Sequence, residues 1–381
     1  MPASDPHLPE IVALRHLLHA HPEVSNAEAW TSATIAERLR AGGADEVVTG
    51  LGGHGVAAIF HAETSGPTVL LRSELDALPI PEIGDVAYRS RNDGVGHLCG
   101  HDGHSAILML LARRLAERRP ERGRVVLLFQ PAEETGEGAS RVIDDPRFAD
   151  LKPDYALSLH NLPGLPFGEV ALREGPVNCA SRGMRIVLTG RTAHASMPWD
   201  GVSPATALAE LIEALPQLSH GRELDDAFRL ATVTHARLGE AAFGIAPGHA
   251  EVWTTLRTLR DDGMAALCRE AEALAERAAA ERGLQVVVGY DDVYRHCENH
   301  PEAVRFLRDA LDAEGITHTP GQPMYPSEDF GRFGDHARSA MFFLGAGVDH
   351  PRLHNPDYDF PDTLIPIGAG IFERAVRDLL G

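Results

Sequence analysis

The chain has 381 residues, of which 44% are hydrophobic and 24% are charged. This composition excludes a disordered, collagen-like or coiled-coil protein, and the length is sufficient for two domains. The formal net charge is −20, with 35 Lys and Arg against 55 Asp and Glu. Phosphate backbones and anionic membrane surfaces repel such a chain, so we expect neither nucleic acid nor a membrane as a partner.

The first part of the chain alternates strand-like and helical segments. A helix covers residues 35–39 and ends at Gly42, and a second helix is predicted at 105–118. Short apolar runs predict buried strands at 68–72, 125–129, 155–159 and 340–344, and a final helix is predicted at 367–380. This alternation predicts an α/β fold with a mostly parallel mixed sheet and helices on both faces.

The middle of the chain has a different order of elements. Strands are predicted at 185–189, 229–237, 250–258 and 285–288, with helices at 204–215 and 261–282. This β-α-β-β-α-β order predicts a smaller α+β domain at 181–292, inserted into a discontinuous domain formed by 1–180 and 293–381.

Cysteine usage and the N-terminus bear on the location of the protein. The four cysteines are widely scattered, without the spacing of a disulfide framework: Cys99, Cys179, Cys268 and Cys297. The N-terminal residues lack the basic and apolar regions of a secretory signal. We therefore expect reduced thiols and a cytoplasmic protein.

A histidine or an acidic side chain follows each of the predicted buried strands. In open α/β sheets, binding sites form outside the carboxyl ends of the strands. The residues expected at this edge are Asp76 after the first strand, Glu133 and Glu134 after the second, His160 after the third and His354 after the fourth, with Cys99 and His101 just before the helix at 105–118.

These residue types favour a transition-metal site. Imidazole, thiolate and carboxylate together suit zinc and its first-row neighbours, whereas calcium and magnesium prefer oxygen ligands. Five candidate ligands exceed the needs of one tetrahedral ion, so we expect two divalent ions, Zn²⁺ or Mn²⁺, with Co²⁺ and Ni²⁺ as alternatives. We assign Glu134 to the metal and Glu133 to proton transfer, although adjacency alone does not fix which carboxylate does which.

Each of these residues has a commoner structural interpretation when taken alone. A single His at a strand end is usually a hydrogen-bonded residue, a single Cys is usually a small buried apolar residue, and Glu133-Glu134 resembles the solvated first turn of a helix. Their joint occurrence at one sheet edge makes the metal site the better interpretation.

The motifs resemble the M20-type metallopeptidases, in particular the aminoacylase/amidohydrolase branch with hippurate hydrolases, N-acyl-amino-acid deacylases and auxin-conjugate hydrolases. The resembling segments are collinear and span nearly the whole chain. They are residues 21–23 (HPE), 75–79 (LDALP), 99–104 (CGHDGH), 130–134 (QPAEE), 160–161 (HN), 194–198 (HASMP), 257–258 (RT), 327–330 (SEDF) and 353–356 (LHNP).

The resemblance implies roles for individual residues. It implies a binuclear site with the ligands Cys99, His101, Glu134, His160 and His354, with Glu133 as catalytic base and Asp76 orienting a ligand. It also implies that the domain at 181–292 is a lid and homodimerisation domain. His194 would polarise the scissile carbonyl, often in the partner subunit's site, and Arg257 would pair with the substrate carboxylate.

Three positions depart from the family pattern. Residues 244–248 read GIAPG where relatives usually have Asn-Val-Ile-Pro-Asp, Asn178 stands where an apolar residue is commoner, and Trp199 replaces a frequent histidine. All three lie where substrate would be held, so we interpret them, Asn178 included, as determinants of substrate preference.

The expected function is therefore metal-dependent hydrolysis of the amide bond of an N-acyl amino acid or a related small conjugate. The alternatives are an M20-type dipeptidase or aminopeptidase, and a catalytically silent protein that binds metal or amino acids. Loss of Glu133 or of two ligands would have favoured the silent protein, but all are present.

Overall fold

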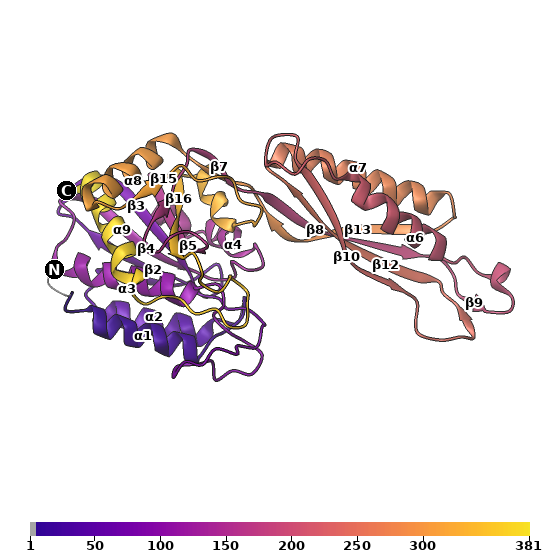
Figure 1. Cartoon of the computed structure of the whole chain (residues 1–381), viewed down its shortest axis with the longest axis horizontal. Helices are drawn as coiled ribbons and strands as arrows, with labels where there is room; N and C mark the ends of the chain where they lie inside the picture. The colour runs from indigo at the N-terminus through magenta and orange to yellow at the C-terminus, as the bar shows by residue number, and fades with distance from the viewer. Residues whose placement is uncertain (1–4) are drawn as a thin grey trace. The chain divides into compact units, whose positions relative to one another are not determined.

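The computed structural model describes residues 5–381, and Figure 1 shows two compact units. Unit 1 extends to Val177 and resumes at Glu298–Gln322 and Asp329–Gly381, and unit 2 comprises Asn178–Cys297 and Pro323–Glu328. Unit 2 thus includes a short segment from near the C-terminus in addition to the region of the predicted insertion. Residues 1–4, the start of the segment that is not expected to be a secretory signal, lie outside the described residues.

An eight-stranded mixed sheet forms the centre of unit 1, in the order β1-β2-β4-β3-β5-β16-β6-β15. The central strands β4, β3, β5 and β16 are parallel to one another. At one edge β2 pairs antiparallel with both β1 and β4, and at the other β6 pairs antiparallel with β16 but parallel with β15. The predicted α/β fold with a mixed sheet is therefore confirmed. The strands are β1 (Glu46–Leu51), β2 (Gly55–His61), β3 (Thr64–Glu74), β4 (Arg122–Gln130), β5 (Tyr155–Pro163), β6 (Val170–Ala171), β15 (His318–Thr319) and β16 (Arg338–Gly347).

Helices cover both faces of this sheet, because its strands are apolar on both sides. On β4, Val125 and Leu127 belong to the main core, whereas Val126 between them points to the opposite face. The main core is covered by α1 (Leu8–Ala20), α2 (Ala29–Ala41), α3 (His101–Glu117), α8 (Pro301–Glu314) and α9 (Leu364–Leu380), and the other face by α4 (Gly138–Asp144), α5 (Phe148–Leu151) and the 3₁₀ segment η3 (Asp329–Asp335).

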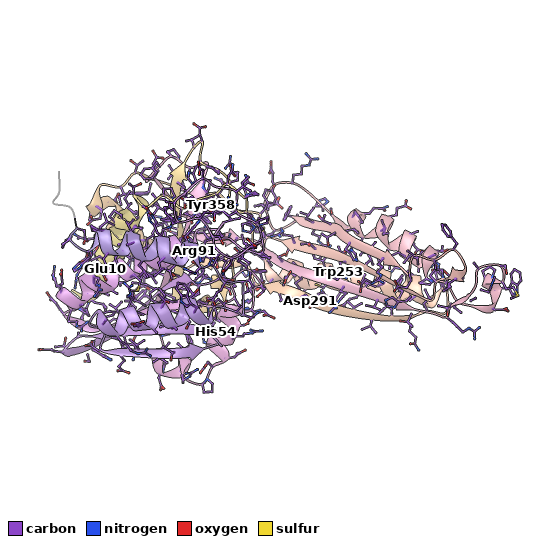
Figure 2. All side chains as sticks on the ribbon, turned by 90° about the horizontal axis from the view of Figure 1, so that it is seen from below. Glu10, His54, Arg91, Trp253, Asp291 and Tyr358 are labelled. Atoms are coloured by element: carbon purple, nitrogen blue, oxygen red, sulfur yellow. The ribbon has the colours of Figure 1, made fainter. Side chains whose placement is uncertain are left out.

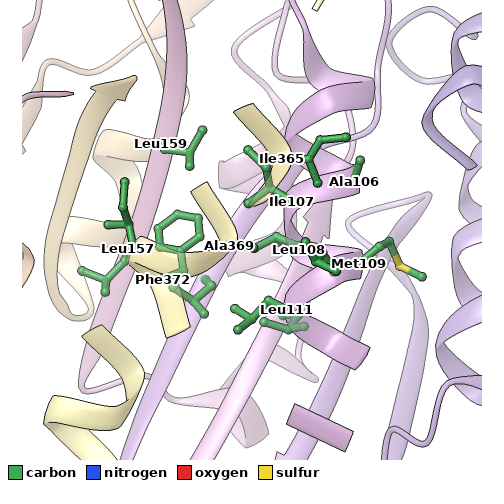
Figure 3. Packing of buried hydrophobic residues seen from close by; sticks show 14 of the residues in the cluster. Ala106, Ile107, Leu108, Met109, Leu111, Leu157, Leu159, Ile365, Ala369 and Phe372 are labelled. Atoms are coloured by element: carbon green, nitrogen blue, oxygen red, sulfur yellow. The ribbon is translucent and has the colours of Figure 1, made fainter. Parts of the chain in front are cut away.

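The main core of unit 1 fixes the position of α3, which begins next to the proposed ligands. Figure 3 shows Ile107 and Leu111 of α3 beside Ala369 and Phe372 of α9, with Leu157 of β5 nearby. All of these side chains are at most 1% exposed. Close packing of this kind holds helix and sheet rigidly, and so fixes the loops that leave them.

The structure differs from the sequence prediction at several element ends. Helix α3 begins at His101 rather than at residue 105, because Gly100 provides a left-handed residue with φ of 92° at its N-cap. Strand β5 continues to Pro163, so His160 lies within the strand and not after it. The prediction did not include α1, α8, β1 or β2.

Unit 2 consists of a four-stranded antiparallel sheet with α6 (Ala205–Ala214) and α7 (Asp261–Ala280) packed on one face. Its strands, in the order β10-β12-β8-β13, are β8 (Ala180–Thr189), β10 (Arg229–Leu238), β12 (His249–Thr258) and β13 (Gln285–Tyr294). The opposite face carries Trp253, which Figure 2 labels and which is 44% exposed. Among residues 5–381, no helix has both the length and the apolar character needed to cross a membrane.

Smaller elements complete the chain. The strands β7 (Gly175–Asn178) and β14 (Cys297–Asn299) pair with each other where the chain enters and leaves the inserted region, and β9 (Ala193–His194) pairs with β11 (Ile245–Ala246). Two short 3₁₀ segments are η1 (Pro198–Asp200) and η2 (Leu215–Leu218).

Candidate metal centre

The proposed ligands come together in unit 1 from separate segments of the chain. Cys99 and His101 flank the N-cap of α3, Glu134 follows β4, His160 lies in β5, and His354 lies in the loop after β16. Gly100 permits this arrangement, because a Cβ at this position would come within 2.2 Å of Asn161 Oδ1. The glycine thus lets the ligand-bearing turn approach β5 closely.

The ligand atoms lie at distances that one or two cations could bridge. Cys99 Sγ is 3.4 Å from His160 Nε2, and His354 Nε2 is 3.6 Å from Glu134 Oε1. His101 Nε2 lies 3.9 Å from the same Glu134 oxygen and 4.0 Å from Glu133 Oε2. The side chains therefore form overlapping groups of three potential ligands, which share Cys99, His101 and Glu134.

Backbone contacts hold the imidazoles of His101 and His160 so that one ring nitrogen of each points toward the other proposed ligands. His101 Nδ1 lies 2.9 Å from the carbonyl oxygen of Asp76, and His160 Nδ1 lies 2.8 Å from that of Asn161. A carbonyl can only accept a hydrogen bond, so Nδ1 carries the proton in both rings when they are neutral, and Nε2 has the lone pair. His101 Nε2 is buried and has no hydrogen-bond partner among the described residues. This is the arrangement expected of metal-binding histidines.

The electrostatics of the group also fit a divalent cation. Burial raises the pKa of the Cys99 thiol, and Glu134 and Glu133 raise it further. Burial alone would lower the pKa of His101, but Asp76 and the other nearby carboxylates raise it to about 10. Both raised pKa values reflect the negative charge of the carboxylates around Cys99 and His101, which a proton or a metal ion must balance. The nitrogen, sulfur and oxygen donors match zinc and its neighbours.

Glu133 lies beside the ligands and is held by a second set of contacts. It is 6% exposed, and its Oε1 accepts a hydrogen bond of 3.4 Å from the backbone of Asp329. The Asp329 carboxylate in turn accepts hydrogen bonds from Gln130 and from the backbone of Ala139, and pairs with Arg72. Glu133 is thus next to the proposed metal ligands and anchored to a buried polar network.

A layer of polar side chains behind the ligands was not identified from the sequence. His104 Nδ1 lies 2.7 Å from Glu74, and His104 Nε2 lies 2.6 Å from Asn161 Oδ1. The Asn161 amide donates to the Tyr358 hydroxyl at 2.7 Å. These contacts hold the segment that contains His160. His104 and Asn161 both lie in the sequence motifs at 99–104 and 160–161, and this position is the sequence signal for their supporting role.

A second buried network links α1 to the segments that carry Cys99 and His354. The fully buried Arg15 donates to Asp102 at 2.8 Å, and His19 contacts the same carboxylate at 2.9 Å and Glu82 at 3.2 Å. Arg15 also pairs with Asp359 in the loop of His354. Burial would raise the pKa of Asp102, but Arg15 and His19 hold it well below its usual range.

The other three predicted site residues belong to unit 2. His194 is exposed on β9, and its Nδ1 lies 3.1 Å from the backbone nitrogen of Ser196. Arg257 on β12 donates through Nη1 to Tyr325 O at 2.6 Å and to Ser327 Oγ at 2.8 Å, and burial lowers its pKa. Their catalytic and substrate-binding roles stay predictions.

Asn178 has a structural partner within unit 2. It is 3% exposed, and its amide donates to the carbonyl of Pro326 at 3.1 Å, whereas its buried Oδ1 has no hydrogen-bond partner among the described residues. The amide therefore helps to hold the segment Pro323–Glu328 against unit 2. Its predicted contact with substrate also stays a prediction.

Comparisons with known proteins agree with this geometry. Residues 70–378 match the model of peptidase family M20/M25/M40. The chain is 31% identical to N-acetyl-L-cysteine deacetylase of Bacillus subtilis, over 97% of this chain and 88% of that protein. It is 30% identical to hippurate hydrolase of Campylobacter jejuni, over 96% of this chain and 95% of that protein.

A solved structure shares the fold. A B. subtilis protein described as a dinuclear metal-binding peptidase of the M20 family superposes with a TM-score of 0.81 at 24% identity, over 98% of each chain. The extent of these matches, together with the buried donor group at the sheet edge, shows that the chain belongs to peptidase family M20/M25/M40 and is a metal-dependent amidohydrolase of that family.

Proposed function

We propose that the protein hydrolyses the amide bond of N-acyl amino acids, releasing a carboxylate and the free amino acid. The observation that carries the proposal is the buried Nε2 of His101, which faces the carboxylates of Glu133 and Glu134 but has no hydrogen-bond partner among the described residues. The names of the two relatives, N-acetyl-L-cysteine deacetylase and hippurate hydrolase, support this substrate class.

In the proposed reaction, Glu133 is the general base and later the general acid. Two divalent ions held by Cys99, His101, Glu134, His160 and His354 would supply Lewis-acid chemistry to water and to the scissile carbonyl. Glu133 accepts a proton from the attacking water and transfers it to the nitrogen of the leaving amine. The contact from the Asp329 backbone to Oε1 supports this role, because it fixes one carboxylate oxygen and leaves Oε2 on the side of His101.

His194 is proposed to stabilise the oxyanion. A backbone N–H can only donate, so the contact from Ser196 makes His194 Nδ1 an acceptor and leaves the proton of the neutral ring on Nε2. The exposed Nε2–H is then available as a hydrogen-bond donor to the developing negative charge. In keeping with the family resemblance, His194 is proposed to make this contact in the active site of the partner subunit of a homodimer.

Arg257 is proposed to bind the substrate carboxylate. Its Nη1 contacts Tyr325 and Ser327, and a guanidinium has further donors for a two-point contact with a carboxylate. We expect Arg257→Met to raise KM for an N-acetyl amino acid at least about tenfold, as for loss of a charge-assisted hydrogen bond. KM for the corresponding carboxamide should change little. Arg237→Met, which removes an exposed arginine of the same unit, is the matched control.

Unit 2 is proposed to act as lid and homodimerisation domain. Trp253 and Val287, which are 44% and 67% exposed, lie on the sheet face opposite α6 and α7. Exposed apolar side chains on one face are typical of protein interfaces. Sedimentation equilibrium tests this part of the proposal: Trp253→Glu should convert a dimer into monomers, and a monomeric wild-type protein would contradict it.

Metal identity and location are the remaining parts of the proposal. Zn²⁺ or Mn²⁺ suits the donor set, and metal analysis of protein purified without added metal distinguishes them. A cytoplasmic location is supported by the four cysteines, which are buried and lie far apart in the sequence without the spacing of a disulfide framework.

The main test measures amine release from N-acyl amino acids and dipeptides, with added Zn²⁺ or Mn²⁺, with chelator, and with Glu133→Gln. We expect chelator-sensitive cleavage of N-acyl amino acids, reduced at least about 100-fold by Glu133→Gln. Glu137→Gln, four residues further on in a half-exposed ion pair, is the control and should retain activity. Cleavage of dipeptides alone would favour the peptidase alternative, and bound metal without turnover would favour the silent binding protein.

A further inference from the structure

The turn that carries Glu133 contains a strained residue immediately before it. Ala132 has φ of 52°, in the left-handed region that residues other than glycine rarely adopt, and it is 0% exposed. Its carbonyl accepts a hydrogen bond of 3.0 Å from Gly138 N. The direction in which Glu133 leaves the backbone depends on this conformation, so the contacts that enforce it bear on catalysis.

Two buried carboxylates accept the peptide N–H groups on either side of Glu133. Glu28 Oε1 accepts from Ala132 N at 2.8 Å, and Asp76 Oδ2 accepts from Glu134 N at 2.9 Å. Both carboxylates belong to residues that are 0% exposed. Glu133 is thus held between two backbone anchors from different parts of the chain. The Asp76 anchor also contacts the proposed ligand His101, whereas the Glu28 anchor makes its hydrogen bond to the strained residue itself.

The Glu28 side chain is buried, with one of its oxygens unsatisfied in the described part of the chain. Its backbone carbonyl begins α2 by accepting from Ser32 N, but its side chain makes no cap to that helix. Its Oε2 is buried without a hydrogen-bond partner among the described residues. Burial raises the pKa of the Glu28 carboxyl, and the nearby Asp76 carboxylate acts in the same direction. Burying a carboxyl group with one unsatisfied oxygen costs free energy, so we expect this side chain to have a function that offsets the cost.

We propose that Glu28 is a positioning residue, whose hydrogen bond to Ala132 N holds the turn in its left-handed conformation and so directs the Glu133 carboxylate. This inference rests on the proposed role of Glu133 as base. It assigns to Glu28 no contact with metal or substrate. Without its acceptor, the turn relaxes toward an ordinary backbone conformation and displaces Glu133, while Asp76 still anchors Glu134.

The proposal predicts a loss in kcat without a matching change in substrate or metal binding. A displacement of about 1 Å at a reacting group lowers a rate by about 100-fold. We therefore expect Glu28→Ala to lower kcat by about 10-fold to 100-fold. KM and the dissociation constant of the metal, measured by calorimetry on the chelator-treated protein, should stay within about threefold of the wild type. Glu28→Gln retains a carbonyl oxygen as acceptor and should retain kcat within about threefold.

A second substitution tests the backbone directly. Glycine adopts positive φ without strain, so Ala132→Gly in the Glu28→Ala background should restore the turn and recover at least about fivefold in kcat. If Glu28→Ala does not fold, Glu28→Asp takes its place, because the shorter carboxylate cannot reach Ala132 N. Asn299→Ala is the matched control: it removes a buried side-chain acceptor of a backbone N–H, that of Met341, at the same 2.8 Å. It should lower stability but not kcat.

The outcomes separate this inference from the proposed function. If Glu133→Gln retains turnover, the proposed role of Glu133 fails. If Glu133→Gln is inactive but Glu28→Ala and Glu28→Asp turn over like the wild type, the positioning role alone is wrong. Equal losses of kcat in Glu28→Gln and Glu28→Ala, or no recovery with Ala132→Gly, would also contradict it, because a role in packing or charge would then explain the loss.

Discussion

The buried histidine of α1 makes the stability of unit 1 depend on pH. Burial alone would lower the pKa of His19, but hydrogen bonds and attraction from Asp102, together with Glu82, raise it to about 9. The folded state therefore binds a proton that the unfolded chain, with a pKa near 6.5, releases more easily. This contribution to stability is fully present below about pH 6.5 and is lost as the pH rises through about 9.

The magnitude follows from the difference between the two pKa values. At about 1.4 kcal/mol for each pH unit, the rise from about 6.5 to about 9 corresponds to about 3 kcal/mol. The geometry supports a charged ring, because both nitrogens face carboxylates, at 2.9 Å and 3.2 Å. Arg15 Nη2, at 3.2 Å from Nδ1, opposes the charge and is included in this value.

Urea unfolding of the wild type and of His19→Gln provides the test. Replacing Trp199 and Trp253 by Phe leaves Trp30, in unit 1, as the fluorescent reporter. The difference in unfolding free energy between wild type and variant should be about 3 kcal/mol larger at pH 6 than at pH 10. Other groups that titrate in this range are common to both proteins and cancel in the difference. A difference that is the same at both pH values would refute a charged His19.

Three further predictions concern the site and its supports. Gly100→Ala should lower stability by at least about 2 kcal/mol and weaken metal binding, as measured by thermal unfolding and calorimetry, because φ is 92° and the new methyl group would come within 2.2 Å of Asn161 Oδ1. Arg72→Met should lower the unfolding free energy by about 3–5 kcal/mol in urea titrations, since it leaves the buried Glu74 and Asp329 without their cation. Chelation should abolish turnover, and Zn²⁺ or Mn²⁺ should restore it; full activity in chelator would contradict a metal-dependent reaction.

The sequence predicts the site best where histidine, cysteine or acidic residues directly follow a predicted strand. The apolar runs at 68–72, 125–129 and 340–344 all lie within strands of the central sheet, and the predicted ligands after them meet in the structure. Parallel strands place their carboxyl ends at the same edge of the sheet. Polar residues that follow such strands can therefore be expected to lie close together. The start of α3 was predicted too late, because His101, Asp102 and His104 do not look like the apolar stripe of a helix.

The buried polar pairings could not be predicted, because they join residues far apart in the sequence. Arg15 and Asp102 are 87 residues apart, and Glu28 and Ala132 are 104 apart. In the sequence, Arg15 looks like an ordinary polar residue of an amphipathic helix, and Glu28 like a surface residue at a helix start. Only tertiary packing shows that both are buried, and burial determines their roles.

The dispersion of the ligands along the chain has a thermodynamic consequence. Two ions held by the residues that flank the N-cap of α3, the turn after β4, strand β5 and the loop after β16 would together close three long loops of the chain. The unfolded chain could form such a site only at a large cost in conformational entropy. Metal affinity then adds directly to the free energy of unfolding, as RT ln(1 + [M]/Kd). A chelator would therefore lower the free energy of unfolding of unit 1. The melting temperature would in turn rise with the concentration of free metal ion.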